Sequence, residues 1–84
     1  MREALGEIMV EYFDFEVLRG EQVISSETSV PLHNTRAAWP KIVKIARGLE
    51  QTGCRIRVRE QSGDTVILIG AAAARKFSEP EFQA

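Results

Sequence analysis

The sequence predicts an α+β domain in which an antiparallel sheet of about four strands, in β-β-α-β-β order, carries one main helix on one face and a short C-terminal helix. Two segments alternate apolar and polar residues with the period of a strand, and a segment between them repeats apolar residues with the period of a helix. The chain has 84 residues, 44% of them hydrophobic, which suffices for one two-layer core and no more.

The first strand is predicted from Ile8 to Leu18, because β-branched and aromatic side chains pack well on a pleated surface. Its alternation places Phe13, Phe15 and Val17 on a core face, and Tyr12, Asp14 and Glu16 on the opposite face. Gly20 supplies a tight turn, and Gln22–Ser25 form a returning strand. Residues 26–34 are rich in Ser, Thr, Pro and Asn, so we expect a connection there.

The main helix is predicted from the apolar residues Ala38, Ile42, Ile45 and Leu49, whose spacings of 4, 3 and 4 place them on one face. Pro40 is tolerated only in the first turn, so the helix should begin near residues 36–39 with Asn34 or Thr35 as its cap. Trp39 is expected to anchor the core or its rim. Gly53 is the expected C-terminal stop.

A second hairpin is predicted over residues 54–69. Alternation divides its first strand into a core face with Cys54, Ile56 and Val58 and an opposite face with Arg55, Arg57 and Arg59. Residues 61–64 form the turn, and 65–69 the last strand. The short helix 71–77 needs docking, which we assign to Phe77. Residues 1–77 are thus one domain and 78–84 a frayed tail. The pattern leaves the strand order open, apart from making hairpin strands neighbours.

Charge is distributed unevenly along the chain, although the formal net charge is only -1. Residues 1–34 hold two basic groups against seven acidic ones, a net -5, whereas residues 35–60 hold seven against two, a net +5. We therefore expect the acidic first part to meet the basic middle, within one chain or between copies. The weak overall charge argues against nucleic acid as the main partner.

Composition gives no support to an enzyme, a cofactor or a metal centre, and we predict none of them and no catalytic residue. With one cysteine and one histidine, the chain cannot form an internal disulfide or assemble a Cys/His zinc site. His33 is expected to be solvated and Cys54 to be a buried thiol. Phosphate-cradling glycine motifs are absent.

The expected location is the cytoplasm, without membrane contact. Carboxylates interrupt the N-terminus where a signal peptide needs an apolar run. The longest uncharged run, residues 65–74, is half of the roughly 20 residues a membrane helix requires.

Several short motifs resemble a family of small bacterial domains of unknown function, of the kind found in rhizobia, that open with a Tyr-Phe-Phe-Asp-like strand. The motifs are Tyr12-Phe13-Asp14-Phe15, Gly20, Val30-Pro31-Leu32 and Ile56–Glu60 with Ser62-Gly63, within residues 11–70. The resemblance implies this order of elements and a bacterial, cytoplasmic origin, and it carries over no activity.

The arginine row, defined as Arg55, Arg57 and Arg59, is the sharpest functional signal. Its steps of about 6.6 Å approach the spacing of phosphates along a nucleic-acid strand, and Tyr12 could stack beside it. Asp14 and Glu16 share that face, however, so Arg57 or Arg59 should form cross-strand pairs with one of them.

Our leading hypothesis is therefore a non-enzymatic interaction module that self-associates or binds another protein, through the uncovered sheet face or a strand edge. The alternative is a nucleic-acid-binding domain that uses the arginine row, and nucleic acid is the less favoured partner.

Overall fold

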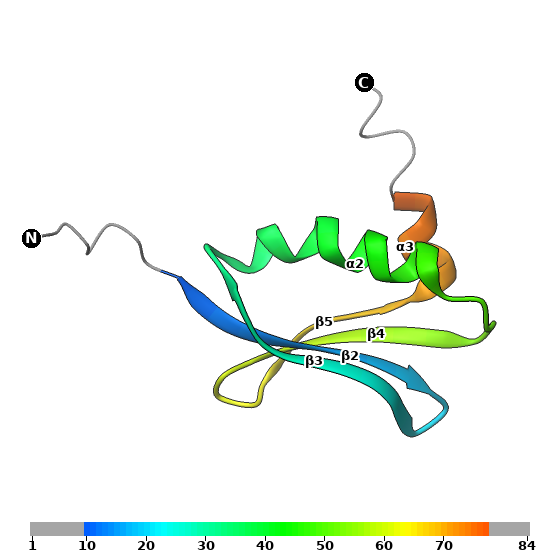
Figure 1. Ribbon diagram of the computed structural model, residues 1–84, viewed down its shortest axis with the longest axis horizontal. Coiled ribbons are helices and arrows are strands. Elements are labelled where there is room, and N and C mark those ends of the chain that lie inside the picture. The colour runs from blue at the N-terminus through cyan, green and yellow to red at the C-terminus, as the bar shows by residue number, and fades with distance from the viewer. Residues whose placement is uncertain (1–9, 78–84) are drawn as a thin grey trace, which may run out of the picture.

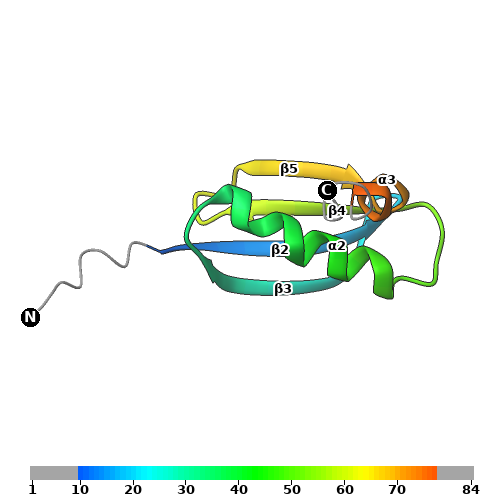
Figure 2. The ribbon, with the colours of Figure 1, turned by 90° about the horizontal axis from the view of Figure 1, so that it is seen from above.

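The computed structural model describes residues 10–77 and has the α+β fold that the sequence predicts. The elements are, in order, β2 (Glu11–Arg19), β3 (Gln22–Leu32), the 3-10 turn η1 (Thr35–Ala37), α2 (Ala38–Gly48), β4 (Cys54–Glu60), β5 (Thr65–Gly70) and α3 (Ala71–Phe77). The four strands form one antiparallel sheet in the order β3-β2-β4-β5. Both helices lie on the same side of this sheet, and α2 crosses the strands at an angle (Figures 1 and 2).

The core lies between the sheet and α2. The two inner strands supply Phe13, Phe15, Ile56 and Val58, which are at most 1% exposed, and α2 covers them with Ile42. Phe15 pairs with Val58 and Val17 with Ile56 across the β2–β4 ladder, so β2 turns its odd-numbered residues toward the helix and β4 its even-numbered ones. The period-two alternation read from the sequence is confirmed in both strands.

The second strand is much longer than the sequence predicted. We expected a connection over 26–34, which is wrong, because β3 continues to Leu32. The strand lies at the sheet edge, where polar side chains remain hydrated and where Pro31 is tolerated. Its ladder with β2 is irregular at two places, and Ser29 has a φ of 57° in one of them.

The main helix begins as predicted and ends earlier. The Asn34 side chain accepts a hydrogen bond from the Ala37 N–H at 2.9 Å, η1 follows, and Pro40 lies in the first turn of α2. The predicted stop at Gly53 is wrong, because α2 ends at Gly48. Gly53 instead lies in the loop that leads to β4, with a φ of 78°.

An arginine from the last helix binds backbone carbonyls at the end of α2. Arg75 of α3 donates from Nε to the Ala46 carbonyl at 3.1 Å and from Nη2 to the Leu49 carbonyl at 3.5 Å. These carbonyls lie at the C-terminus of α2, where helical partners run out. Ala71 and Ala74 are buried in the shared core, so α3 docks as the sequence required. The side chain of Phe77, the predicted strand start at residues 8 and 9, and the predicted tail 78–84 lie outside the described residues.

Candidate interaction surface

The arginine row lies on the sheet face opposite the helices, as the alternation predicted. We call this surface the open face and define it by the residues of even parity on β2, the arginine row on β4, and Val23 and Leu68 on the flanking strands. The register places Glu16 beside Arg57, Asp14 beside Arg59, and Leu68 beside Arg57 on the other side. Ile56 and Val58, the alternate residues of β4, are fully buried on the helix side.

Glu16 is the centre of the open face. Its Oε1 accepts from Arg57 Nε at 2.6 Å and lies 2.6 Å from Arg57 Nη2, while its Oε2 accepts from Arg59 Nη1 at 3.4 Å. The Glu16 side chain is only 13% exposed, which strengthens these charge-assisted bonds relative to a fully hydrated pair. The predicted cross-strand pairs are therefore confirmed, with Glu16 as the acid for both arginines.

The ends of the arginine row are tied to the two hairpin turns. Arg55 Nη2 donates to the Gly20 carbonyl at 3.2 Å, and Arg59 Nε donates to the Gly63 carbonyl at 3.2 Å. Asp14 forms no ion pair with Arg57 or Arg59 in the described structure. Its Oδ1 instead accepts the backbone N–H of Ser29 at 3.0 Å. Each guanidinium of the row thus already has an acceptor within the chain.

The acidic first part and the basic middle meet within one chain, which is one of the two arrangements that the charge distribution allowed. Glu16 meets the arginine row on the open face, and Glu27 of β3 meets Lys41 of α2 at 2.9 Å on the helix side. Lys41 Nζ also lies 5.6 Å from the centre of the Phe15 ring. Charge complementarity along the sequence therefore serves the fold of the single chain.

The open face also holds apolar side chains that the sequence reading did not assign. Leu18 has the parity of Glu16, yet it is only 5% exposed and lies outside the main core cluster. Its neighbours in register are Val23 and Arg55. Val23 and Leu68 are 48% and 51% exposed. The sequence could have placed Leu18 on the open face, because the alternation that puts Asp14 and Glu16 there continues to residue 18.

The two edges of the sheet differ in chemistry. β3 contains Glu27 and Pro31, four Ser or Thr residues and two ladder irregularities. β5 has the sequence Thr-Val-Ile-Leu-Ile-Gly, without charge or proline. It pairs with β4 alone among the described elements, and Figure 2 shows it at the margin of the sheet with α2 lying over the inner strands. Within residues 10–77, the outward backbone groups of β5 therefore have no strand partner.

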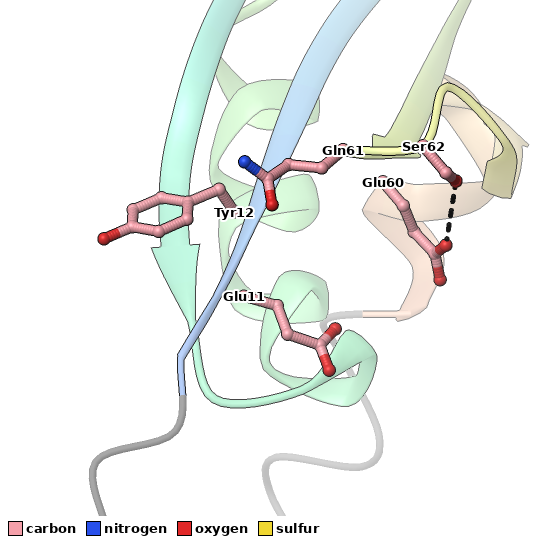
Figure 3. A pocket seen from close by; sticks show the side chains of 5 residues that line it. All are labelled: Glu11, Tyr12, Glu60, Gln61 and Ser62. Atoms are coloured by element: carbon pink, nitrogen blue, oxygen red, sulfur yellow. Dashed lines mark hydrogen bonds between the residues drawn. The ribbon is translucent and has the colours of Figure 1, made fainter. Parts of the chain in front are cut away.

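A shallow hollow of about 260 Å³ lies where β2 begins and β4 ends. Its lining consists of Glu11, Tyr12, Glu60, Gln61 and Ser62. The Ser62 hydroxyl donates to Glu60 Oε1 at 3.3 Å, and the Tyr12 ring points away from both carboxylates (Figure 3). The lining offers carboxylates, hydroxyls and one amide, and it contains no imidazole, thiol or lysine.

The residues that could have formed a catalytic group lie apart. Cys54 is buried on the helix side, and Asp14 lies on the open face, opposite Arg59 in the strand register. His33 is exposed after β3. The described residues contain no group of three or more metal-ligating side chains. No described helix has both the length and the hydropathy to span a membrane.

No family model, curated protein or solved structure matches this chain. The resemblance to the bacterial family that opens with a Tyr-Phe-Phe-Asp-like strand accordingly stays a prediction.

Proposed function

We propose that this protein is a non-enzymatic interaction module that self-associates by pairing β5 with β5 of a second copy. The observation that carries the proposal is the contrast between the edges. β3 has a charge, a proline and two irregularities, which are the devices that keep edge strands from pairing, whereas β5 has neither charge nor proline. The only irregularity in the ladder of β5 falls at its beginning, between the partners of Val58 and Arg59.

The pairing of two copies through β5 is antiparallel, about a two-fold axis perpendicular to the sheet. Residues directly opposite each other must then point to the same side, so one residue faces its own copy and the axis passes midway between these two. Placing Leu68 opposite its own copy satisfies this condition and buries the most apolar surface. It places Ile67 opposite Ile69 of the second copy on the core side, and it covers Leu68, which is 51% exposed, with its own counterpart.

An uncharged strand suits this arrangement because a two-fold axis brings identical residues together. Charged residues at the axis would face like charges and weaken the pair. The six residues of β5 present none, and the result would be one continuous sheet of two chains. The same edge would also accept an extended segment of another protein by strand addition. The arginine row does not enter this proposal, because its guanidiniums are engaged by Glu16 and by turn carbonyls.

The experiment is sedimentation of the full chain over a concentration series, with Leu68→Lys as the test and Val23→Lys as the matched control. Both residues are apolar, similarly exposed and located on edge strands, but on opposite edges. We expect the wild type and Val23→Lys to dimerise alike, and Leu68→Lys to raise the dimer Kd at least about tenfold, since two lysines would meet at the axis.

Two results would overturn the proposal. One is a wild-type chain that keeps monomer mass up to about millimolar concentration at low salt, a range that covers even weak protein pairs. The other is a dimer that Val23→Lys disrupts and Leu68→Lys leaves intact. If the wild type is monomeric but binds an added β5 peptide, self-association is ruled out and the β5 edge is instead a binding site for a different protein.

A further inference from the structure

The β5 pair described above would place the open faces of two copies side by side, and we call the combined surface the joined face. Arg57 is the neighbour of Leu68 in the β4–β5 register, and Glu16 is the neighbour of Arg57 in the β2–β4 register. One line across the joined face therefore consists of Glu16, Arg57 and Leu68, followed by the same residues of the second copy in reverse order. Strands lie about 4.8 Å apart, so the two arginine rows run about 14 Å apart with the Leu68 pair midway between them.

Charge on the joined face is arranged in bands that follow the strands. The central band, which we define as the open-face residues of β4 and β5 from both copies, contains the two arginine rows and no acid. The acids of the face, Asp14 and Glu16, lie on β2, one strand farther from the two-fold axis. A partner no wider than the central band meets cations, whereas a broad anionic surface such as a membrane also meets the acids. The face therefore favours a narrow anionic partner.

The arginines keep hydrogen-bond donors for a partner, although each has an acceptor within the chain. A guanidinium carries five N–H groups, and the contacts within the chain use one of them in Arg55 and two in each of the other arginines. Glu16 also holds Arg57 and Arg59 in place, so these side chains lose less conformational entropy when a second carboxylate binds. The arginine row is thus a preorganised set of donors.

The centre of the joined face is apolar. Contact between the two copies of Leu68, each 51% exposed in the single chain, covers their adjoining sides. Their ends remain toward solvent, because both helices lie on the other side of the sheet (Figures 1 and 2). Gly70 lies on the same face opposite Arg55, and a Cβ added to it would have no atom within 4 Å beyond its chain neighbours. Apolar side chains of a partner therefore have room beside the leucine pair.

We infer, on the basis of the proposed β5 pairing, that the joined face binds one amphipathic helix with acidic flanks per dimer. A helix with its side chains is about 10–12 Å across, which fits between arginine rows about 14 Å apart. Its apolar stripe contacts the Leu68 pair, and acids on both borders of the stripe reach the two rows. An extended segment cannot do this, since its side chains point only toward the sheet and away from it.

The test is binding of a labelled helical peptide to the full chain, followed by fluorescence anisotropy above the dimer Kd that sedimentation gives. The peptide has about 15 residues, with Leu along one stripe and Glu on both borders, and in the matched peptide every Glu is Gln. We expect one acidic peptide per two chains, bound at least about tenfold more tightly than the Gln peptide near 50 mM salt, since several carboxylate contacts add together. The preference should shrink near 500 mM salt, where exposed charges are screened.

A matched pair of variants tests the arginine row. Arg55 and Arg19 are both exposed, and each donates one hydrogen bond within the chain, to the Gly20 carbonyl and to the Gln51 side chain. Arg55 lies on the open face, whereas Arg19 lies opposite Cys54 with the parity of the helix side. Arg55→Gln removes a cation from both rows and should weaken binding of the acidic peptide about fivefold, and Arg19→Gln should change it less than about twofold.

The outcomes separate this site from the pairing on which it depends. A chain that sediments as a monomer overturns the β5 pairing and the helix site together. A dimer that binds neither peptide, or that binds two acidic peptides, overturns the helix site alone. Equal binding of the acidic and Gln peptides, or equal losses in the two variants, also overturns it, because the arginine row would then have no part in recognition. Tighter binding to anionic vesicles or to single-stranded nucleic acid overturns the choice of partner.

Discussion

The two edge strands of this sheet show opposite ways of ending a β-sheet. β3 is eleven residues long and exposed over most of its length, and it is interrupted by bulges and by Pro31. β5 is six residues long, regular from Ile67 to Gly70, and apolar. Long edges are the more dangerous ones, and here the long edge is the protected one. The comparison teaches that edge chemistry, more than edge length, indicates where a second strand can add.

The strongest way to break this contrast is to remove the protection of β3. In Glu27→Val with Pro31→Val, β3 loses its charge and its proline, so both edges become available. When both edge strands can pair, each chain can bind one copy at each edge and chains can continue to add. We therefore expect the sedimenting mass to grow with concentration beyond a dimer. The same double variant combined with Leu68→Lys should stop at small assemblies. A double variant that keeps the wild-type mass would show that neither residue protects β3.

A smaller effect is expected in amide hydrogen exchange, which compares the edges without mutation. Pairing through β5 should slow exchange of the outward amides of residues 66–70 at least about tenfold when protein concentration rises from well below to well above the dimer Kd. The amides of β3 should exchange equally fast at both concentrations. Protection that rises on β3 and not on β5 would assign self-association to the other edge.

The smallest effect concerns the bulge of β3. Asp14→Ala removes the acceptor of the Ser29 N–H, a bond of 3.0 Å that holds the backbone at a positive φ. Because the bond is made to a charged group at an exposed position, we expect its removal to lower the free energy of unfolding by about 1 kcal/mol. Urea denaturation measures this loss, with Asp64→Ala, an acid that is exposed in the β4–β5 turn, as the control. Equal stability of both variants would show that Asp14 does not stabilise the bulge of β3.

The fold was predictable wherever the periodicity was set by burial. β2, β4 and α2 each bury one face, so their sequences alternate or repeat with a period that specifies both element and orientation. β3 buries almost nothing, so its residues resemble a loop in composition and only the pairing with β2 makes them a strand. The adjacency of β2 and β4 joins segments about 40 residues apart and left no local signal.

The candidate surfaces were predictable to the same limit. The sides taken by Arg57 and Glu16 followed from parity, and their pairing needed the β2–β4 neighbourhood that only the structure shows. The contact of Arg75 with the end of α2 could not be predicted, because Arg75 lies 29 residues beyond Ala46.

The contact of Arg75 with α2 has a further consequence for β5. A short, uncharged, apolar strand has few features of its own that hold it in one alignment with β4. α3 follows β5 directly, so a slip by two residues would carry Arg75 about 6.6 Å from the carbonyls of Ala46 and Leu49. The hydrogen bonds of the Arg75 guanidinium to α2 thus favour one alignment of β5 with β4. The self-association proposed for β5 therefore does not require β5 to carry charged or proline residues that would fix its alignment.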